Sequence, residues 1–351
     1  MTATIEPSAG APSVADQVPV LMTQVAGYVG HRTIAIGLRG GLVRAVAERP
    51  GSTADDLAEH LALDNFYVSV WCRSALAAGV LVRDGGGLRL APHMDTLLLD
   101  TGSPAYVGGV FTLFEQPEVF GRFAANLATG ERMWWDDTSP EWITQVSGTG
   151  TPFYTRLIPG GLALVPGLTE RLEAGCRVVD TACGAGRGVV RLATTYPNCE
   201  VVGIDGDAHS IAEARKRVEA AGLADRVRLE CIPLEDMTLD EPAAVVINNI
   251  SMHECRDIDR VAANVLAMLE SGGWFVISDF PFPDTDEALR TPPGRVMCGI
   301  QFFEAQIDDQ LLPRAAYDDL LSRHGFAHMG SAALTLMHTL TYGRGPGGGS
   351  R

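Results

Sequence analysis

The sequence predicts an α/β protein in which a Rossmann-like, doubly wound parallel sheet follows an N-terminal, mostly helical winged-helix domain. The first observation is an alternation of helix-like segments with apolar runs of strand length. The strands are expected at 178–180, 201–205, 226–231, 244–249 and 274–278. The second is the order of the earlier segments: helix-like stretches come first, and two short apolar runs around a glycine-rich turn follow. A parallel sheet of this kind binds ligands beyond the carboxyl ends of its strands.

Length and composition limit the possible classes of protein. The chain has 351 residues, 46% of them apolar, which is enough for two domains of about 150 residues with real cores. A net charge of −16 argues against nucleic acid as a partner, because phosphate binding requires clustered Lys and Arg. The chain has no apolar run of about 18 residues and no basic, hydrophobic leader, so neither a membrane span nor a signal peptide is expected. The seven cysteines, an odd number without a C-x-x-C motif, fit a reducing cytoplasm.

The N-terminal part is expected to contain a disordered segment, residues 1–18, and a winged-helix domain, residues 19–104. Helical spacing of apolar residues predicts a helix over 23–38, and a short apolar segment follows at 42–47. Ser52 and Thr53 precede two acids, as at a capped helix start, and a further helix is expected over 65–78. The runs 80–83 and 88–90 flank Asp84-Gly85-Gly86-Gly87, which is a hairpin signal.

A winged helix by itself fits either a DNA-binding regulator or a dimerisation domain. The polar face of the helix over 65–78 carries one basic residue, Arg73, and no row of hydrogen-bond donors for bases. We therefore interpret the domain as a dimerisation and lid structure, and we keep a cofactor-sensing regulator as a remote alternative.

The most informative stretch runs from Val178 to Gly188. It is expected to form a buried strand ending at Asp180 and a turn containing Gly184 and Gly186, and a helix is expected to start near Val189. A second strand ends in an acid, Asp205, which is followed by Gly206. Strand, glycine turn, helix, strand and acid form a nucleotide-binding βαβ unit, in which the second acid can bind two ribose hydroxyls.

Asp180 indicates which cofactor this unit binds. A carboxylate before the turn would repel a pyrophosphate, whereas it suits a ligand with an ammonium group. The glycine spacing also departs from the G-x-G-x-x-G pattern of dinucleotide sites. We therefore expect S-adenosyl-L-methionine, which has no phosphate and carries a positive sulfonium.

The stretch resembles motif I of the class I S-adenosylmethionine-dependent methyltransferases, although Ala182 stands where that pattern usually has glycine. The whole chain is similar to small-molecule O-methyltransferases with an N-terminal winged-helix dimerisation domain. The resemblance implies a homodimer, a helical linker and pocket wall over 105–168, a cofactor-binding catalytic domain over 169–343 and a disordered C-terminus over 344–351. The residues expected at the cofactor are Asp180, Gly184, Gly186, Asp205, Gly206, Asp236, Asn248 and Tyr154.

His253 is the candidate catalytic base, because it follows the fourth predicted strand, at the ligand crevice of such a sheet. An imidazole titrates near neutrality and can accept the proton of a substrate hydroxyl as the methyl group arrives. Small-molecule O-methyltransferases have a His-Asp pair at this position, and here Glu254 takes the place of the Asp. Asp279, at the end of the fifth strand, either faces the crevice or caps the strand.

A second resemblance points to different chemistry. The segment 299–306, followed by Leu312-Pro313, is similar to the α-keto acid C-methyltransferases, which hold a metal with the histidine after strand four and a second histidine. Glu304 occupies that second position here. His253 and Glu304 would suit Fe(II), Zn or Mn, and the metal would stabilise the enolate of a keto acid.

The sequence thus predicts a methyltransferase that acts on a small natural product of secondary metabolism, such as an antibiotic intermediate. O-methylation with His253 as base is the first hypothesis, and metal-assisted C-methylation is the alternative. Glu254 and Glu304 are the further catalytic candidates. The side chains expected to contact substrate are Trp134, Trp135, Met252, Phe302 and Phe303.

Overall fold

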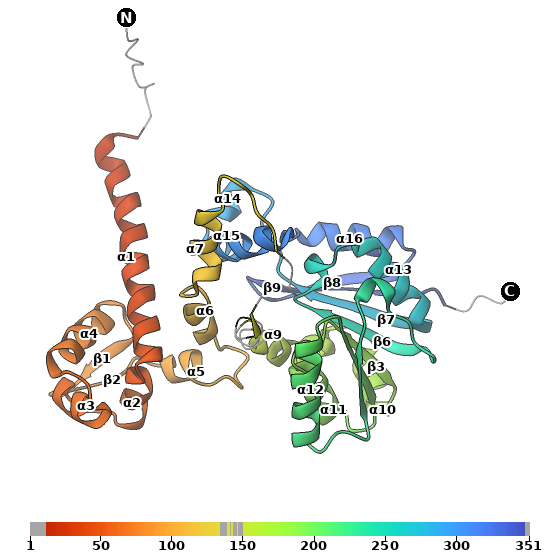
Figure 1. Cartoon of the computed structure of the whole chain (residues 1–351), viewed down its shortest axis with the longest axis horizontal. Helices are drawn as coiled ribbons and strands as arrows, with labels where there is room; N and C mark the ends of the chain where they lie inside the picture. The colour runs from red at the N-terminus through yellow and green to blue at the C-terminus, as the bar shows by residue number, and fades with distance from the viewer. Residues whose placement is uncertain (1–11, 134–138, 141, 143–145, 147–149, 348–351) are drawn as a thin grey trace, which may run out of the picture. The chain divides into compact units, whose positions relative to one another are not determined.

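The computed structural model describes residues 12–133, 139, 140, 142, 146 and 150–347 (Figure 1). The chain divides into two compact units. The N-terminal unit consists of Met1–Asp100 and Val107–Glu115, and the second unit of Thr101–Tyr106 and Gln116–Arg351. None of the described helices is both long and apolar enough to cross a membrane.

The N-terminal unit is a helical bundle with a two-stranded wing. Its elements are α1 (Val14–Arg39), α2 (Leu42–Glu48), α3 (Ala54–Leu61), α4 (Asn65–Ala77), β1 (Leu81–Asp84), β2 (Gly87–Leu90), α5 (Met94–Leu98) and α6 (Gly108–Leu113). The strands form the predicted antiparallel hairpin, with Leu81 opposite Leu90. Trp71 Nε1 donates to Thr33 O at 2.9 Å, which fixes α4 against α1. The winged-helix prediction is confirmed.

Helix α1 begins at Val14, earlier than the predicted start at residue 23 and inside the segment 1–18 that was expected to be disordered. The cause is a capping box, in which the side chains of Ser13 and Asp16 each accept a hydrogen bond from the other residue's backbone N–H. The helix continues through Pro19, the first residue of the predicted winged-helix domain. The prediction of disorder is therefore wrong for residues 14–18.

The second unit is built on a seven-stranded sheet with the order β5-β4-β3-β6-β7-β9-β8. The strands β3 (Arg177–Thr181), β4 (Glu200–Asp205), β5 (Val227–Cys231), β6 (Ala243–Asn249) and β7 (Leu269–Asp279) are parallel, and β9 (His338–Arg344) and β8 (Ala327–Thr335) complete the sheet in antiparallel fashion. The chain runs outward from β3 in both directions. This places the topological switch point, and so the expected crevice, beside the carboxyl ends of β3 and β6.

Helices cover both faces of the sheet (Figure 1). They include α10 (Leu168–Ala174), α11 (Arg187–Thr195), α12 (Ala208–Ala220), α13 (Ile258–Met268) and α16 (Arg314–Arg323). Val178 packs into a core cluster with Leu192 and Ile211, whereas its neighbour Val179 packs into a second cluster with Val265 and Leu320. Adjacent residues point to opposite faces of a strand, and both faces are buried, so the strands are continuous apolar runs. The α/β doubly wound prediction is confirmed.

The remaining elements of the second unit are short helices and turns that precede the sheet or connect its strands. They are α7 (Pro117–Ala125), α9 (Thr151–Arg156), two short helical turns over 157–164, the turns Leu234–Asp236 and Met252–Glu254, α14 (Asp286–Leu289), α15 (Pro292–Glu304) and the turn Ala305–Ile307. The prediction of disorder over 344–351 is wrong at its start, because Arg344 pairs with Trp274 and Gly272 N donates to Pro346 O at 3.2 Å.

Candidate functional site

The turn after β3 has a backbone that requires small residues. Ala182, Gly184 and Gly186 all have positive φ, at 59°, 51° and 79°. A Cβ atom at Gly186 would lie 2.8 Å from Cβ of Ala214, so this turn packs directly onto α12. The glycine turn therefore exists as predicted, and Ala182 occupies a left-handed position that favours glycine.

Asp205 stabilises the same turn from the end of β4. Its carboxylate accepts hydrogen bonds from the backbone N–H groups of Gly184 and Asp207, each at 2.8 Å. Burial raises the pKa of Asp205 to about 6, although these two bonds oppose the shift. Each carboxylate oxygen retains acceptor capacity for a ligand hydroxyl.

Asp180 and Tyr154 meet at the end of β3. The Asp180 side chain is fully buried, and its Oδ1 accepts a hydrogen bond from the Tyr154 hydroxyl at 3.2 Å. Its Oδ2 has no hydrogen-bond partner among the described residues. A Cβ atom at Gly188 would lie 2.1 Å from the Tyr154 ring and 2.3 Å from this oxygen, so only glycine fits there. Burial raises the pKa of Asp180 to about 8. A buried acid with a free oxygen fits a ligand that brings a positive group.

Of the other predicted cofactor residues, Asn248 and Gly206 lie at the carboxyl ends of the strands, whereas Asp236 is an exposed residue in an ion pair. Asn248 is buried at the end of β6, where its Nδ2 donates to Thr181 Oγ1 at 3.1 Å and its Oδ1 has no partner among the described residues. Gly206 lies next to Pro233. Asp236, by contrast, is exposed and forms an ion pair with Arg260 at 2.6 Å.

His253 lies in the short turn after β6 and is 5% exposed. Its Nδ1 is 2.9 Å from both carboxylate oxygens of Asp279, the last residue of β7. Ile250, the first residue after β6, has a φ of 58°. Its N–H donates to Ser278 O of β7 at 2.7 Å, which fixes the start of the turn that carries His253. The Nε2 atom of His253 has no hydrogen-bond partner among the described residues.

Acidic side chains surround this free nitrogen. Glu304 Oε2 lies 3.8 Å and Glu254 Oε1 lies 4.0 Å from Nε2. Ligand atoms of the three side chains all fall within 4.8 Å of one another. Glu304 is buried at the last residue of α15, where the helix dipole disfavours a negative charge. We call His253, Glu254 and Glu304 the His-Glu-Glu cluster.

Burial and charge set the protonation of this cluster. Burial alone would lower the pKa of His253, but the carboxylates of Asp279, Glu304 and Glu254 raise it to about 10. Burial raises the pKa of Glu304 to about 7 and holds that of Glu254 well above its usual range. The cluster therefore contains the imidazolium of His253 beside carboxyl groups that hold a proton to higher pH than ordinary glutamates do.

The sequence left the role of Asp279 open and missed Tyr317. Tyr317 Oη donates to Asp279 Oδ2 at 2.7 Å, and Phe280 N donates to Oδ1 at 2.8 Å. The position of Asp279 at a strand end was a usable signal for a crevice residue. No local pattern identifies Tyr317, because it reaches Asp279 from α16, 38 positions along the chain.

Three of the predicted substrate residues, Met252, Phe302 and Phe303, lie among the described residues and pack against other side chains. Trp134 and Trp135 lie outside the described residues. Met252 is completely buried in the core cluster of Val179, Phe275 and Leu320, so its side chain fills the core. The Phe302 ring packs against Phe120 and Phe123, and the Phe303 ring lies 4.6 Å from Trp142.

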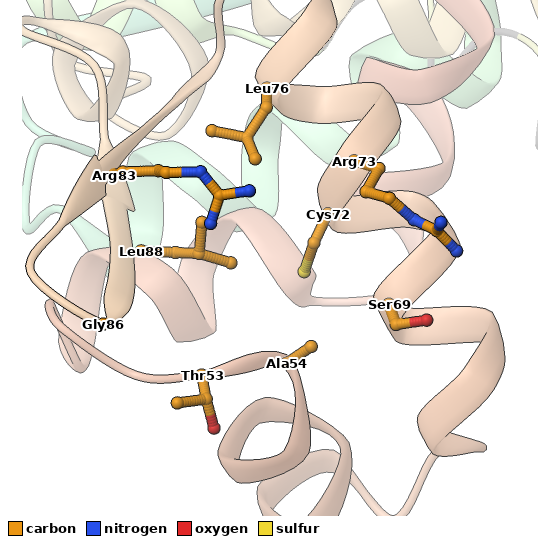
Figure 2. A pocket seen from close by; sticks show the side chains of 9 residues that line it. All are labelled: Thr53, Ala54, Ser69, Cys72, Arg73, Leu76, Arg83, Gly86 and Leu88. Atoms are coloured by element: carbon orange, nitrogen blue, oxygen red, sulfur yellow. The ribbon is translucent and has the colours of Figure 1, made fainter.

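A cavity of about 320 Å³ lies in the N-terminal unit, between α3, α4 and the hairpin (Figure 2). Figure 2 shows the Arg83 guanidinium pointing into it, beside Leu76 and Cys72. Burial raises the pKa of Cys72 to about 11, which leaves no thiolate nucleophile there at neutral pH. All the residues that line it belong to the N-terminal unit, and all the described site residues belong to the other unit.

A comparison with known families finds a match within the second unit. Residues 172–314 match a family model described as a methyltransferase domain. Malonyl-[acyl-carrier protein] O-methyltransferase from Nitrosospira multiformis is 28% identical over 127 residues, which are 32% of this chain and 41% of that protein. The chain spans 24%, 41% and 66% of the lengths of the first curated relatives it matches.

Solved structures show the same fold over nearly the whole chain. The mitomycin 7-O-methyltransferase is 16% identical, with a TM-score of 0.70 and coverage of 94% of this chain and 98% of its own. Human N-acetylserotonin methyltransferase, solved with S-adenosylmethionine, is 15% identical, with a TM-score of 0.69 and coverage of 96% and 99%. At these identities the likeness establishes the fold.

Proposed function

We propose that this chain, whose residues 172–314 form a methyltransferase domain, is an S-adenosylmethionine-dependent methyltransferase that methylates a hydroxyl group of a small natural product. The observation that carries the proposal is the contact between His253 and Asp279. This pair lies at the carboxyl ends of β6 and β7, and the glycine turn follows the carboxyl end of β3 in the same sheet. The mitomycin 7-O-methyltransferase has the same architecture, which supports a natural-product substrate.

The residues at the glycine turn fit the cofactor. The free Oδ2 of Asp180 suits the ammonium group, and the carboxylate of Asp205 suits the ribose hydroxyls. S-Adenosylmethionine supplies a methyl group on a positively charged sulfur. The absence of a Cβ at Gly188 lets Tyr154 and Asp180 pack directly against the start of α11, which holds the buried carboxylate at the glycine turn.

His253 is the group proposed to accept the substrate's proton. Asp279 accepts from the Nδ1–H group, so the proton-accepting lone pair can form only at Nε2. Because the raised pKa leaves a proton on Nε2 in the free protein, that proton must leave before His253 acts as a base. Glu304 Oε2, 3.8 Å away, is the nearer of the two carboxylate oxygens beside Nε2, and its charge is one cause of the raised pKa of His253. Buried side chains also exclude water from the reacting hydroxyl.

Replacement of the base tests this proposal. In His253→Ala, turnover of a hydroxylated acceptor should fall by about 10²–10⁴-fold, the usual contribution of a general base. Binding of S-adenosylhomocysteine, measured by calorimetry, should change little, because Asp180 and Asp205 remain. Unchanged turnover in the variant would remove His253 from the mechanism.

The His-Glu-Glu cluster favours a second candidate function, metal-assisted C-methylation of an α-keto acid. One imidazole nitrogen and two carboxylate oxygens within 4.8 Å fit a divalent Fe, Zn or Mn ion. The hydrogen bond from His253 Nδ1 to Asp279 is the outer contact that metal-binding histidines usually make. His253, Glu254 and Glu304 would hold the ion, which would polarise a keto acid and favour its enolate.

Metal analysis separates the two candidates. One equivalent of metal after gentle purification, absent from both Glu304→Ala and Glu254→Ala, would support C-methylation. Full O-methylation activity after chelation would support the first proposal. Arg295→Ala, at an exposed position of the same helix as Glu304 and outside the cluster, is the control for damage to α15.

We also propose that two copies associate through α1. This 26-residue helix exposes an apolar stripe at helical spacing, consisting of Val18, Leu21, Met22, Val25, Tyr28 and Val29, each at least 50% exposed. The double variant Leu21→Glu/Val25→Glu should be monomeric by light scattering, and Arg44→Glu on α2 should behave as the parent. A parent chain that is already a monomer at micromolar concentration would contradict the proposal.

A further inference from the structure

Two cysteines lie side by side at the amino ends of β3 and β4. Cys176 and Cys199 each come directly before the first residues of the ladder, Arg177 and Glu200, which are paired. The backbone holds them together, because Glu200 N donates to Cys176 O at 3.0 Å. Their Sγ atoms are 3.9 Å apart. A disulfide requires a separation of about 2.05 Å, so modest side-chain rotation suffices for closure.

We propose that Cys176 and Cys199 form a redox modification site, in which a peroxide oxidises the two thiols to a reversible disulfide between β3 and β4. The site is separate from the proposed methyl-transfer chemistry, because it lies at the amino ends of the strands and the cofactor residues lie at their carboxyl ends.

The surroundings of the pair favour a thiolate at Cys199 over one at Cys176. The hydrogen bond between the two thiols lowers the pKa of Cys199 and raises that of Cys176, and the charges of Arg171 and Arg226 add to the shift at Cys199. In its protonated form the Cys199 thiol donates to Leu172 O at 3.1 Å. Burial has the opposite result at Cys72, Cys183 and Cys255, whose pKa values are raised. Cys176 is partly exposed, so a small oxidant can reach the pair from that side.

The reaction balances with hydrogen peroxide as the oxidant. The Cys199 thiolate attacks one peroxide oxygen, which forms an S–O bond, breaks the O–O bond and releases the other oxygen as water. The Cys176 sulfur then attacks the Cys199 sulfenic acid, which forms the S–S bond, breaks the S–O bond and releases a second water. Two thiols lose two electrons and two protons, and a dithiol reductant restores them.

The bond would affect stability more than ligand binding. The segment Cys176–Cys199 contains β3, the glycine turn and α11, and a crosslink at its ends restricts this segment in the unfolded chain. Disulfides of this loop size typically raise the midpoint of thermal unfolding by roughly 4–10 °C for a protein of this size. Affinity for S-adenosylhomocysteine should stay within about twofold, because no cofactor residue has to move.

The experiment uses the full chain, treated with hydrogen peroxide, alkylated with iodoacetamide and digested without reduction. We expect a linked pair of peptides containing Cys176 and Cys199, two hydrogens lighter than the separate thiol peptides. Dithiothreitol should remove the link and the rise in unfolding midpoint together. Cys231→Ser, at an exposed cysteine of β5, should still form the link.

Cys176→Ser and Cys199→Ser should lose both the linked peptide and the thermal shift. The melting curves of the reduced variants report whether each folds, and Cys176→Ala and Cys199→Ala serve if a serine variant does not. Three results would overturn the proposal: both cysteines alkylated after peroxide treatment, Cys199 oxidised to sulfinic acid without a link, or Cys176 and Cys199 linked to other cysteines.

Discussion

The Nδ1 atom of His253 lies 2.9 Å from each carboxylate oxygen of Asp279, and this carboxylate is itself held by Tyr317 and the Phe280 N–H. Burial would raise the pKa of Asp279, but the charge and hydrogen bond of His253 lower it below its ordinary value. Asp279 is therefore ionised, and it fixes the imidazole plane with Nε2 toward Glu304. The orientation of the imidazole therefore depends on three elements: β6, which precedes His253, β7, which ends at Asp279, and α16, which contains Tyr317.

Asp279→Asn should reduce turnover by about 10²–10⁴-fold while leaving cofactor affinity within about twofold, because the amide no longer selects the Nδ1–H tautomer. The ¹⁵N chemical shifts of the His253 ring report its protonation and, where the ring is neutral, its tautomer, independently of activity. Tyr317→Phe, which keeps the carboxylate and removes one of its donors, should have a much smaller effect. Equal losses in the two variants would show that packing, not the tautomer, is responsible.

Cofactor affinity should depend on pH through Asp180. Its pKa is raised to about 8 by burial, so the free protein holds this proton below pH 8 and loses it above. A ligand ammonium favours the ionised form, so the association constant for S-adenosylhomocysteine should fall about tenfold per unit as pH drops from about 8 to 6. Calorimetry in buffers of different ionisation enthalpy would measure the proton released. Asp180→Asn should bind weakly and without this slope, and a slope that persists in this variant would assign it to another group.

Asp205→Ala should weaken cofactor binding by about 1–3 kcal/mol, because ribose hydroxyls would lose their acceptor and the Gly184 N–H would be left unpaired. Asp205→Asn retains one acceptor oxygen and should lose less. Asp207→Ala is the matched control, since it removes the cap of α12 without touching the turn after β3. Equal affinity in the parent and Asp205→Ala would exclude the ribose role.

Ala182→Gly should stabilise the protein by about 1 kcal/mol, because a φ of 59° places the alanine Cβ against the backbone, whereas glycine adopts this conformation without strain. The gain is read as a higher midpoint of chemical denaturation with an unchanged slope. Gly186→Ala, where a Cβ would lie 2.8 Å from Ala214, should destabilise instead. A loss of stability in Ala182→Gly would mean that the alanine methyl makes a contact worth more than the strain.

The parts of this structure that could be predicted from sequence are those determined by neighbouring residues. The strand before Asp180 and the acid at Asp205 are recognisable because a buried parallel strand is a continuous apolar run and the turn needs glycine. The start of α1 depends on the capping box of Ser13 and Asp16, which the helical spacing of apolar residues from residue 23 onward does not indicate.

The candidate site was only partly predictable, for a different reason. His253 is predictable from its place after the fourth strand, and Glu304 from its resemblance to a family position, but the sequence does not indicate which residue orients His253. That choice depends on which residue of β7 stands next to the end of β6, and on where α16 packs, which are properties of the assembled sheet. Glu254 and Glu304 meet only because α15 ends beside the turn after β6.

Ile250 shows how the cluster is held. A β-branched residue with a φ of 58° is strained by about 1–2 kcal/mol, yet its N–H is firmly bonded to Ser278 O. The free energy of folding of the sheet compensates for this strain in the ligand-free protein. The turn that carries His253 therefore has its position before a ligand binds. Association with a ligand should therefore follow a single exponential whose rate rises linearly with ligand concentration, without the plateau that a slow rearrangement of this loop would impose.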